Sequence, residues 1–198
     1  MTAIYQTNIR VGDIAVIFGM GLIGNFAAQL IELFGARSIG IDVEDNRLRI
    51  AEKTGISYHI QAGKDINIKE VMNKMIGQSY ADIVIEATGV PSLVNDALEL
   101  VRPGGQVILL GSPRGSVEID TYNHIHAKGV HLIGAHEKYQ GEYGMPDRAK
   151  TTKYMLNLIQ KELISVDPLI THIILANNAN EAYELLLNRR EEALGILL

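Results

Sequence analysis

The chain has 198 residues, enough for one or two domains with a buried core, and its apolar share is ordinary for a globular protein. A net charge of -5 argues against a nucleic-acid surface, which needs a basic field, so no nucleic-acid partner is expected. The sequence contains no cysteine, which excludes disulfides, thiolate nucleophiles and cysteine-ligated zinc within this chain.

Residues 1–12 are expected to be a short lead-in that ends at the turn Val11-Gly12-Asp13. Met1 to Arg10 lacks the basic start and apolar centre of a secretory signal. No apolar run approaches the length needed to span a bilayer. These features predict a cytoplasmic protein without a membrane partner.

A buried strand is predicted from Asp13 to Phe18, and the turn that follows it reads Gly19-Met20-Gly21-Leu22-Ile23-Gly24. This turn opens a helix pattern that ends near Gly35. Gly19 permits the tight turn, Gly21 lets a pyrophosphate approach the backbone, and Gly24 lets the helix pack closely on the strand. The flanking elements favour a dinucleotide site over a turn without a ligand, although Gly-x-Gly-x-x-Gly alone is a weak signal.

A second strand, Ser38 to Asp42, ends in an acidic residue 18 positions after Gly24. At this distance a carboxylate is expected to accept hydrogen bonds from the adenosine ribose and to repel a 2′-phosphate. Asp42 and the apolar Val43 therefore predict NAD rather than NADP. Arg47 has two open interpretations: it lies over the adenine or near a 2′-phosphate, or it is a solvated helix charge.

Strands and helices then alternate, which predicts an α/β fold with a doubly wound, parallel, six-stranded sheet, the Rossmann fold, over residues 13–166. Residues 167–198 are expected to form a strand-helix-strand tail. The expected elements after the second strand are helix 45–55, strand 57–60, helix 69–76, strand 82–86, helix 91–100, a turn at 102–105, strand 106–111, helix 123–128, strand 130–135 and helix 148–163.

Residues that follow the fourth and fifth strands are expected to contact the cofactor, because ligands of open α/β sheets lie outside the carboxyl ends of the strands. His136 ends the sixth strand and is assigned to the nicotinamide half. Ordinary turn chemistry is the alternative for the two glycine-containing loops. The residues concerned are Ala87, Thr88, Gly89, Leu110, Gly111 and Ser112.

Four histidines lie between residues 124 and 136, but they lack the spacing and the acidic partners of a zinc site, so no metal ligand is assigned. No catalytic residue is assigned either. None of the tyrosines has a lysine four positions later, which excludes the Tyr-x-x-x-Lys pair of short-chain dehydrogenases.

Several motifs together resemble the cofactor-binding domain of the medium-chain, zinc-dependent alcohol and polyol dehydrogenases. Besides the glycine turn and Asp42, they are Val11-Gly12-Asp13, Glu86-Ala87-Thr88-Gly89, Arg102-Pro103-Gly104-Gly105-Gln106-Val107, Asp167-Pro168-Leu169-Ile170-Thr171-His172 and Asn180-Glu181-Ala182-Tyr183-Glu184-Leu185-Leu186.

The resemblance implies hydride transfer between NAD and an alcohol or polyol, with a catalytic zinc that polarises the oxygen. In that family, zinc is held mainly by an N-terminal catalytic domain. That domain is not in these 198 residues, so the chain is expected to be inactive alone. The resemblance also implies a homodimer through the sixth strand. The apolar strand 194–198 lacks its usual partner and is expected to refold locally, pair with another chain or be disordered.

Two other functions remain open at this point. One is a noncatalytic module that senses NAD and changes its association with a partner. The other is an S-adenosylmethionine-dependent methyltransferase, although such enzymes usually carry an acidic residue just ahead of the glycine turn, where this chain has Ile17-Phe18.

Overall fold

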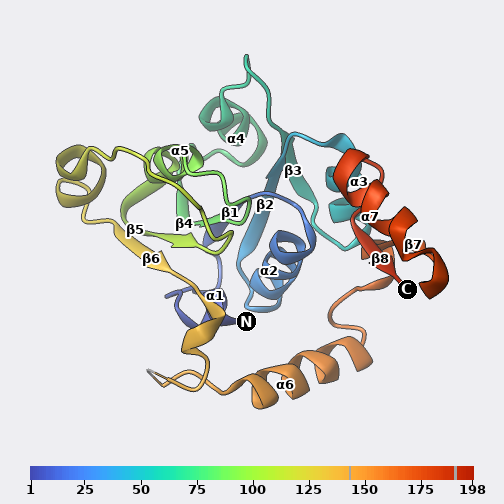
Figure 1. Ribbon diagram of the computed structural model, residues 1–198. Helices are drawn as coiled ribbons and strands as arrows, with labels where there is room; N and C mark the ends of the chain where they lie inside the picture. Colours follow the sequence, from blue (N-terminus) through green and yellow to red (C-terminus); the bar gives the residue numbers. More distant parts are fainter. Residues whose placement is uncertain (143, 190) are drawn as a thin grey trace.

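A computed structural model describes residues 1–198 with the exception of Tyr143 and Arg190. At its centre is a parallel sheet with the strand order β3-β2-β1-β4-β5-β6 (Figure 1). The sequence order of the strands reverses at β1, which has β2 on one side and β4 on the other. The strands are β1 (Ile14–Phe18), β2 (Arg37–Asp42), β3 (Tyr58–Gln61), β4 (Ala81–Glu86), β5 (Val101–Leu109) and β6 (His131–Gly134).

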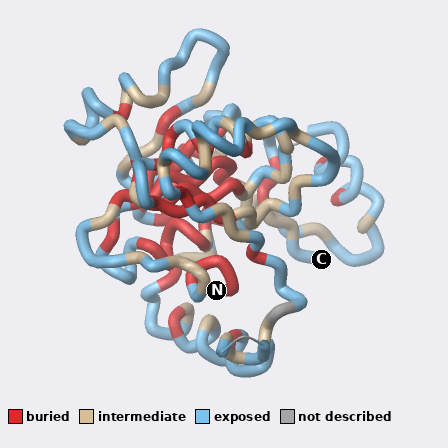
Figure 2. Tube along the Cα trace, turned by 90° about the vertical axis from the view of Figure 1, so that its left-hand side faces the viewer, coloured by how far each residue is buried: buried red, intermediate tan, exposed pale blue. Residues whose placement is uncertain are grey.

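Helices cover both faces of this sheet. One face packs against α1 (Thr2–Tyr5), α2 (Leu22–Leu33), α3 (Asp45–Lys53) and α6 (Arg148–Gln160). The other packs against α4 (Ile68–Ile76) and α5 (Leu93–Leu100). Buried residues gather at the centre of the molecule, where the sheet lies (Figure 2). The doubly wound six-stranded fold expected from the sequence is confirmed.

Strand β1 shows why the central strands are apolar throughout. Ala15 and Ile17 belong to the core on the α2 side, whereas Val16 and Phe18 belong to the core on the α5 side. A parallel strand with both faces covered has no solvent face, so it reads as a continuous apolar run rather than an alternating one.

The first twelve residues are more than a lead-in. Thr2–Tyr5 forms the one-turn helix α1, and its Ala3 and Ile4 are buried in the core on the α2 side. This segment is too short for its helical periodicity to be visible in the sequence. Its conformation depends on the apolar surface of α2 against which it packs.

The turn expected at 102–105 is instead an irregularity inside β5. Ala81 of β4 faces Val101, but Ile83 faces Gln106, so extra residues bulge out of the strand between these pairs. The Arg102 Nε atom donates to Asp82 Oδ1 at 2.5 Å, and the Gly104 N–H donates to the Lys128 carbonyl at 2.8 Å. These contacts hold the bulged residues against β4 and against the segment before β6, whereas Pro and Gly alone favoured a turn that separates two elements.

Four short helical segments of the described residues are not regular α-helices, and one of them replaces the short helix expected at 123–128. The expected helix at 123–128 is a π-helix at Thr121–His126, and it starts earlier because the Asp120 side chain accepts from the Asn123 N–H at 2.9 Å. The other three are 3-10 helices at Glu137–Tyr139, Asp167–Leu169 and Ala176–Asn178.

The tail forms a small unit of its own beside α3 (Figure 1). It contains β7 (Ile170–Ile173), α7 (Ala179–Asn188) and β8 (Gly195–Leu197), and β8 pairs with β7 in parallel. Leu169 and Leu194 are buried against Ile50 of α3 and Phe26 of α2. Of the three outcomes expected for the apolar last strand, local refolding is the one observed.

A buried amide connects α2 to the segment that leads into the tail. The Gln29 side chain is 5% exposed; its Nε2 donates to the Ser165 carbonyl at 3.0 Å, and its Oε1 accepts from the Ser165 N–H at 2.7 Å. Replacing Gln29 by Ala leaves both main-chain groups without these partners. We expect the free energy of unfolding to fall by about 2 kcal/mol in urea titrations.

Gln160→Ala is the matched control, because Gln160 is exposed at the end of α6. Its free energy of unfolding is expected to stay within about 0.5 kcal/mol of the unsubstituted chain. Equal stability of the Gln29 and Gln160 variants would show that the amide pairing adds nothing to the fold.

Candidate functional site

The glycine turn between β1 and α2 has the geometry that its sequence predicts. Gly19 has a φ of +92°, a conformation that L side chains rarely adopt. A Cβ atom at Gly24 would lie 1.8 Å from the Gly19 carbonyl oxygen, so only glycine permits this approach of helix to turn. Both glycines are therefore required by the local fold, whether or not a ligand is bound.

Gly21 differs from these two glycines because it faces open space. Apart from Gly21 itself and its two chain neighbours, no heavy atom of the described residues lies within 4 Å of a Cβ built at this position. Helix α2 begins at the next residue, Leu22, and Leu22 and Ile23 are exposed in its first turn. The first N–H groups of a helix lack partners within the helix and lie at the positive end of its dipole, so this space suits an anionic group.

Asp42 is held against the glycine turn. Its carboxylate is almost buried, at 6% exposure for the residue; Oδ2 accepts from the Met20 N–H at 2.8 Å, and Oδ1 accepts from the Glu44 N–H at 3.0 Å. The Met20 side chain is fully buried against Gly40, so it faces the core rather than a ligand. The role that the structure assigns to Met20 is to anchor Asp42 through its main chain.

Arg47 is not a free helix charge. Its Nη1 lies 3.4 Å from Asp42 Oδ2, and its Nε is buried without a hydrogen-bond partner among the described residues. Val43 lies beside this pair and is 63% exposed. The guanidinium therefore folds back over the end of β2, and any group that approaches Asp42 meets both charges.

The loops after β4 and β5 are in direct contact with each other. A Cβ at Gly89 would lie 2.4 Å from the Gly111 carbonyl oxygen, and one at Gly111 would lie 2.3 Å from the Gly89 nitrogen. Ala87 and Leu110 are half-buried, whereas Thr88 and Ser112 are exposed. Ser112 has a φ of +56°, an uncommon conformation outside glycine that marks a constrained turn.

A cavity of about 410 Å³ joins the first turn of α2 to the ends of β5 and β6. His136 lines it and lies at the end of β6, where its Nδ1 accepts from the Lys138 N–H at 3.1 Å. The structure thus brings four of the residues predicted from the sequence to one cavity: Ile23, Leu110, Ser112 and His136. Further lining residues, which the sequence did not indicate, are Met1, Thr2, Ala3, Ile4, Phe26, Ala27, Leu30, Ala135, Glu137, Gln140 and Met155.

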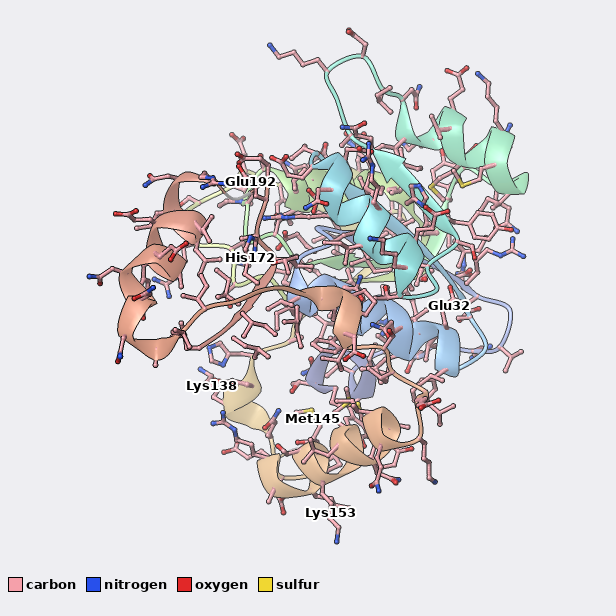
Figure 3. All side chains as sticks on the ribbon, turned by 90° about the vertical axis from the view of Figure 1, so that its right-hand side faces the viewer. Glu32, Lys138, Met145, Lys153, His172 and Glu192 are labelled. Carbon is pink, nitrogen blue, oxygen red and sulfur yellow. The ribbon has the colours of Figure 1, made fainter. Side chains whose placement is uncertain are left out.

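A second cavity, of about 650 Å³, lies between α3 and the tail, and Glu191, Glu192 and His172 are among its lining residues. Asn46 of α3 donates through Nδ2 to the Glu191 carbonyl at 2.9 Å. Figure 3 shows His172 and Glu192 on the tail, and Lys153 on α6 pointing away from the rest of the molecule. A hydrogen bond from the Arg189 side chain lowers the pKa of Glu192. Three acidic residues, Asp167, Glu191 and Glu192, line the cavity together with one lysine, Lys53, so its rim carries more acidic than basic side chains.

A larger hollow of about 1120 Å³ runs along α6, but its lining residues all belong to that helix. It has no opposing element that would enclose a ligand. In the described part of the chain, no three His, Cys, Asp or Glu side chains are grouped so that they could hold a metal ion. Nor is any helix found there with the length and apolar content that a bilayer crossing requires.

The sheet order, the glycine turn and the acidic end of β2 define a Rossmann-type nucleotide-binding domain. The family model described as "Zinc-binding dehydrogenase" matches residues 23–156. The chain belongs to this family and corresponds to the cofactor-binding part of its medium-chain members.

Relatives and solved structures agree with this assignment. L-threonine 3-dehydrogenase from Pseudoalteromonas atlantica is 36% identical over 163 residues, which are 82% of this chain and 45% of the relative. A protein described as a short chain alcohol dehydrogenase from E. coli CFT073, solved with NADH, has the same fold, with a TM-score of 0.84 at 20% identity; the match covers 100% of this chain and 55% of that protein's chain. A zinc-binding dehydrogenase from Sinorhizobium meliloti, solved with NADP, has a TM-score of 0.70 at 25% identity, covering 87% of this chain and 48% of its own. The chain thus spans about half the length of the proteins it matches.

Proposed function

We propose that this chain binds NAD(H) and is the cofactor-binding half of a dehydrogenase that transfers hydride between NAD and an alcohol or polyol. The observation that carries the proposal is the contact between Asp42 and the glycine turn. Its carboxylate accepts from the Met20 N–H, one residue from the open space at Gly21. A ribose acceptor and a pyrophosphate site are thereby held side by side, as dinucleotide binding requires.

The topology supports one orientation of the cofactor. Adenosine would lie over the ends of β1 and β2, next to Asp42, Val43 and Arg47. The nicotinamide half would cross β1 and lie over the ends of β4, β5 and β6, with its ring in the cavity lined by Ile23, Leu110, Ser112 and His136. The proposed contact set also includes Gly19, Gly21, Leu22, Gly24, Ala87, Thr88, Gly89 and Gly111, and Met20 through its main chain alone.

NAD is proposed over NADP because the carboxylate of Asp42 would repel a 2′-phosphate. Arg47 is already paired with that carboxylate, and the cavity between α3 and the tail has an acidic rim. The names of the solved neighbours include both NADH and NADP, so they support a nicotinamide cofactor without choosing between the two.

Catalysis and dimerisation are proposed for the whole enzyme, of which this chain would be the cofactor-binding half. We place the catalytic zinc in a part of the enzyme outside these residues, and we expect no turnover of alcohols by this chain alone. Strand β6 is one of the two edge strands of the sheet, and no strand of the described residues pairs with its outer side, which supports a homodimer through this strand.

The test is a titration of the purified chain with NADH and, in parallel, with NADPH, followed by nicotinamide fluorescence. We expect saturable binding of NADH and at least about tenfold weaker binding of NADPH, since one charge-paired contact is worth that much. S-adenosylmethionine is the control ligand and is expected not to compete. A folded chain that binds neither dinucleotide contradicts the proposed function.

A further inference from the structure

Glu86 is a buried acidic residue that neither the glycine turn nor Asp42 explains. It is the last residue of β4 and is 0% exposed, paired in the sheet with Phe18 of β1 and Leu109 of β5. Its Oε1 accepts from the Thr88 N–H at 2.6 Å, from the Gly89 N–H at 2.9 Å and from the Thr88 hydroxyl. The carboxylate thus holds the first part of the loop that follows β4, at Thr88 and Gly89.

The main chain of the same residue holds the neighbouring loop. The Glu86 carbonyl accepts from the N–H groups of Leu110 and Gly111, both at 2.8 Å. The two loops also touch at Gly89 and Gly111, where neither residue has room for a Cβ atom. A Cβ at Gly19 would lie 2.7 Å from Thr88 Cγ2, so the glycine turn touches the methyl group of Thr88. The hydrogen bonds of the turn run instead to β2, from the Gly19 N–H to the Ile41 carbonyl at 2.7 Å and from the Met20 N–H to Asp42 Oδ2 at 2.8 Å.

Burying the Glu86 carboxylate costs free energy of folding, and a residue whose only role is to end a strand would not require this burial. The second carboxylate oxygen, Oε2, is buried and has no hydrogen-bond partner among the described residues. A buried carboxylate with one oxygen unpaired is unfavourable unless its other contacts compensate. The compensation here is a set of short hydrogen bonds directed at a loop on the proposed cofactor side, which are stronger than those between neutral groups.

We propose that Glu86 is the positioning residue for the nicotinamide half of the cofactor site, because it sets the loops 87–89 and 110–112 as one rigid block. This inference rests on the proposed function. Adenosine is assigned to the other side of β1, where Asp42 is held by Met20 and Glu44. Glu86 therefore acts on the nicotinamide riboside and not on the adenosine.

The experiment compares NADH with ADP, which has the adenosine and the diphosphate but no nicotinamide riboside. Both dissociation constants are measured by calorimetry on the full chain and on Glu86→Gln, and thermal unfolding is recorded for each protein. Glutamine keeps the size of the side chain but removes the charge that strengthens the hydrogen bonds to the loop. We expect NADH to bind about tenfold more weakly, and ADP to bind within about twofold of the unsubstituted chain.

Asp82→Asn is the matched control, because Asp82 lies at the opposite end of the same strand. Its carboxylate also holds main chain, with Oδ2 accepting from the Ile14 N–H at 2.8 Å. This variant is expected to lower the unfolding temperature and to leave the ratio of the two dissociation constants unchanged. A change of that ratio in Asp82→Asn as large as in Glu86→Gln overturns the inference, because a general loosening of β4 would then explain both.

The other outcomes also decide the question. Equal binding of NADH by Glu86→Gln and by the unsubstituted chain overturns the inference and leaves the proposed function intact. An equal loss for NADH and ADP assigns Glu86 to the fold alone. Should Glu86→Gln fail to fold, Glu86→Asp keeps the charge on a shorter side chain, and its NADH-to-ADP ratio is judged by the same criterion. An unsubstituted chain that binds neither ligand overturns the proposed function and the inference with it.

Discussion

Replacing Asp42 by Ser is expected to shift the ratio of NADPH to NADH affinity toward NADPH by about tenfold to a hundredfold, the range for losing one or two charge-assisted contacts. Two effects add. Serine is too short to accept from the ribose hydroxyls as a carboxylate does, which weakens NADH. Loss of the negative charge also removes the repulsion of a 2′-phosphate and frees Arg47, whose Nη1 lies 3.4 Å from Asp42 Oδ2. Both affinities are measured by nicotinamide fluorescence on the folded variant.

Asp42→Asn separates charge from shape, because asparagine keeps the size and one acceptor oxygen next to the Met20 N–H. It should retain more stability than Asp42→Ser, while most of the change in preference persists. Adding Arg47→Ala to Asp42→Ser should cancel the gain for NADPH if the freed guanidinium binds the 2′-phosphate. A preference that is unchanged in Asp42→Ser would refute the role assigned to this carboxylate.

Two glycines of the same turn are expected to differ in what they lose on substitution by alanine: Gly24→Ala loses stability, whereas Gly21→Ala loses affinity for NADH. In Gly24→Ala, the new methyl group would lie 1.8 Å from the Gly19 carbonyl oxygen, so helix and turn must separate. Overpacking between rigid backbone segments is expected to lower the free energy of unfolding by on the order of 3 kcal/mol. Urea titration of the variant beside the unsubstituted chain measures this loss.

Gly21→Ala is the matched substitution and should leave the fold largely intact. The residue has a φ of -64°, which alanine adopts without strain, and its Cβ would point into open space. Loss of the glycine helix cap costs about 1 kcal/mol or less. The methyl group would occupy the position proposed for the pyrophosphate, so NADH affinity should fall by about tenfold or more, as expected when a close charged contact is lost. Normal NADH binding by Gly21→Ala would place the dinucleotide elsewhere.

The parts of the fold that the sequence predicted are those in which local chemistry and tertiary structure agree. The run Ile14 to Phe18 is apolar on both faces because helices cover both faces of the sheet. Gly19 and Gly24 were identified because the positive φ of Gly19 and the lack of room for a Cβ atom at Gly24 both favour glycine. Asp42 could be placed because the length of a βαβ unit sets its distance from the turn.

Other features depend on contacts between residues far apart in the sequence. Helix α1 forms because Ala3 and Ile4 have a partner surface on α2, and the residues at 102–105 stay in β5 because Arg102 meets Asp82. Strand β8 pairs with β7 because both lie next to α3. In the candidate site, the burial of Met20 against Gly40 belongs to the same group.

By itself, the sequence therefore determined the class of fold, the position of the glycine turn and the acid at the end of β2. These features are encoded by residues that are close along the chain or separated by a fixed structural unit. Only the tertiary structure decided that Glu86 joins the loops after β4 and β5, although Glu86 stood in a motif that was visible from the start. The reason is that its partners, Thr88 and Gly89 on one side and Leu110 and Gly111 on the other, meet only when two strands lie side by side.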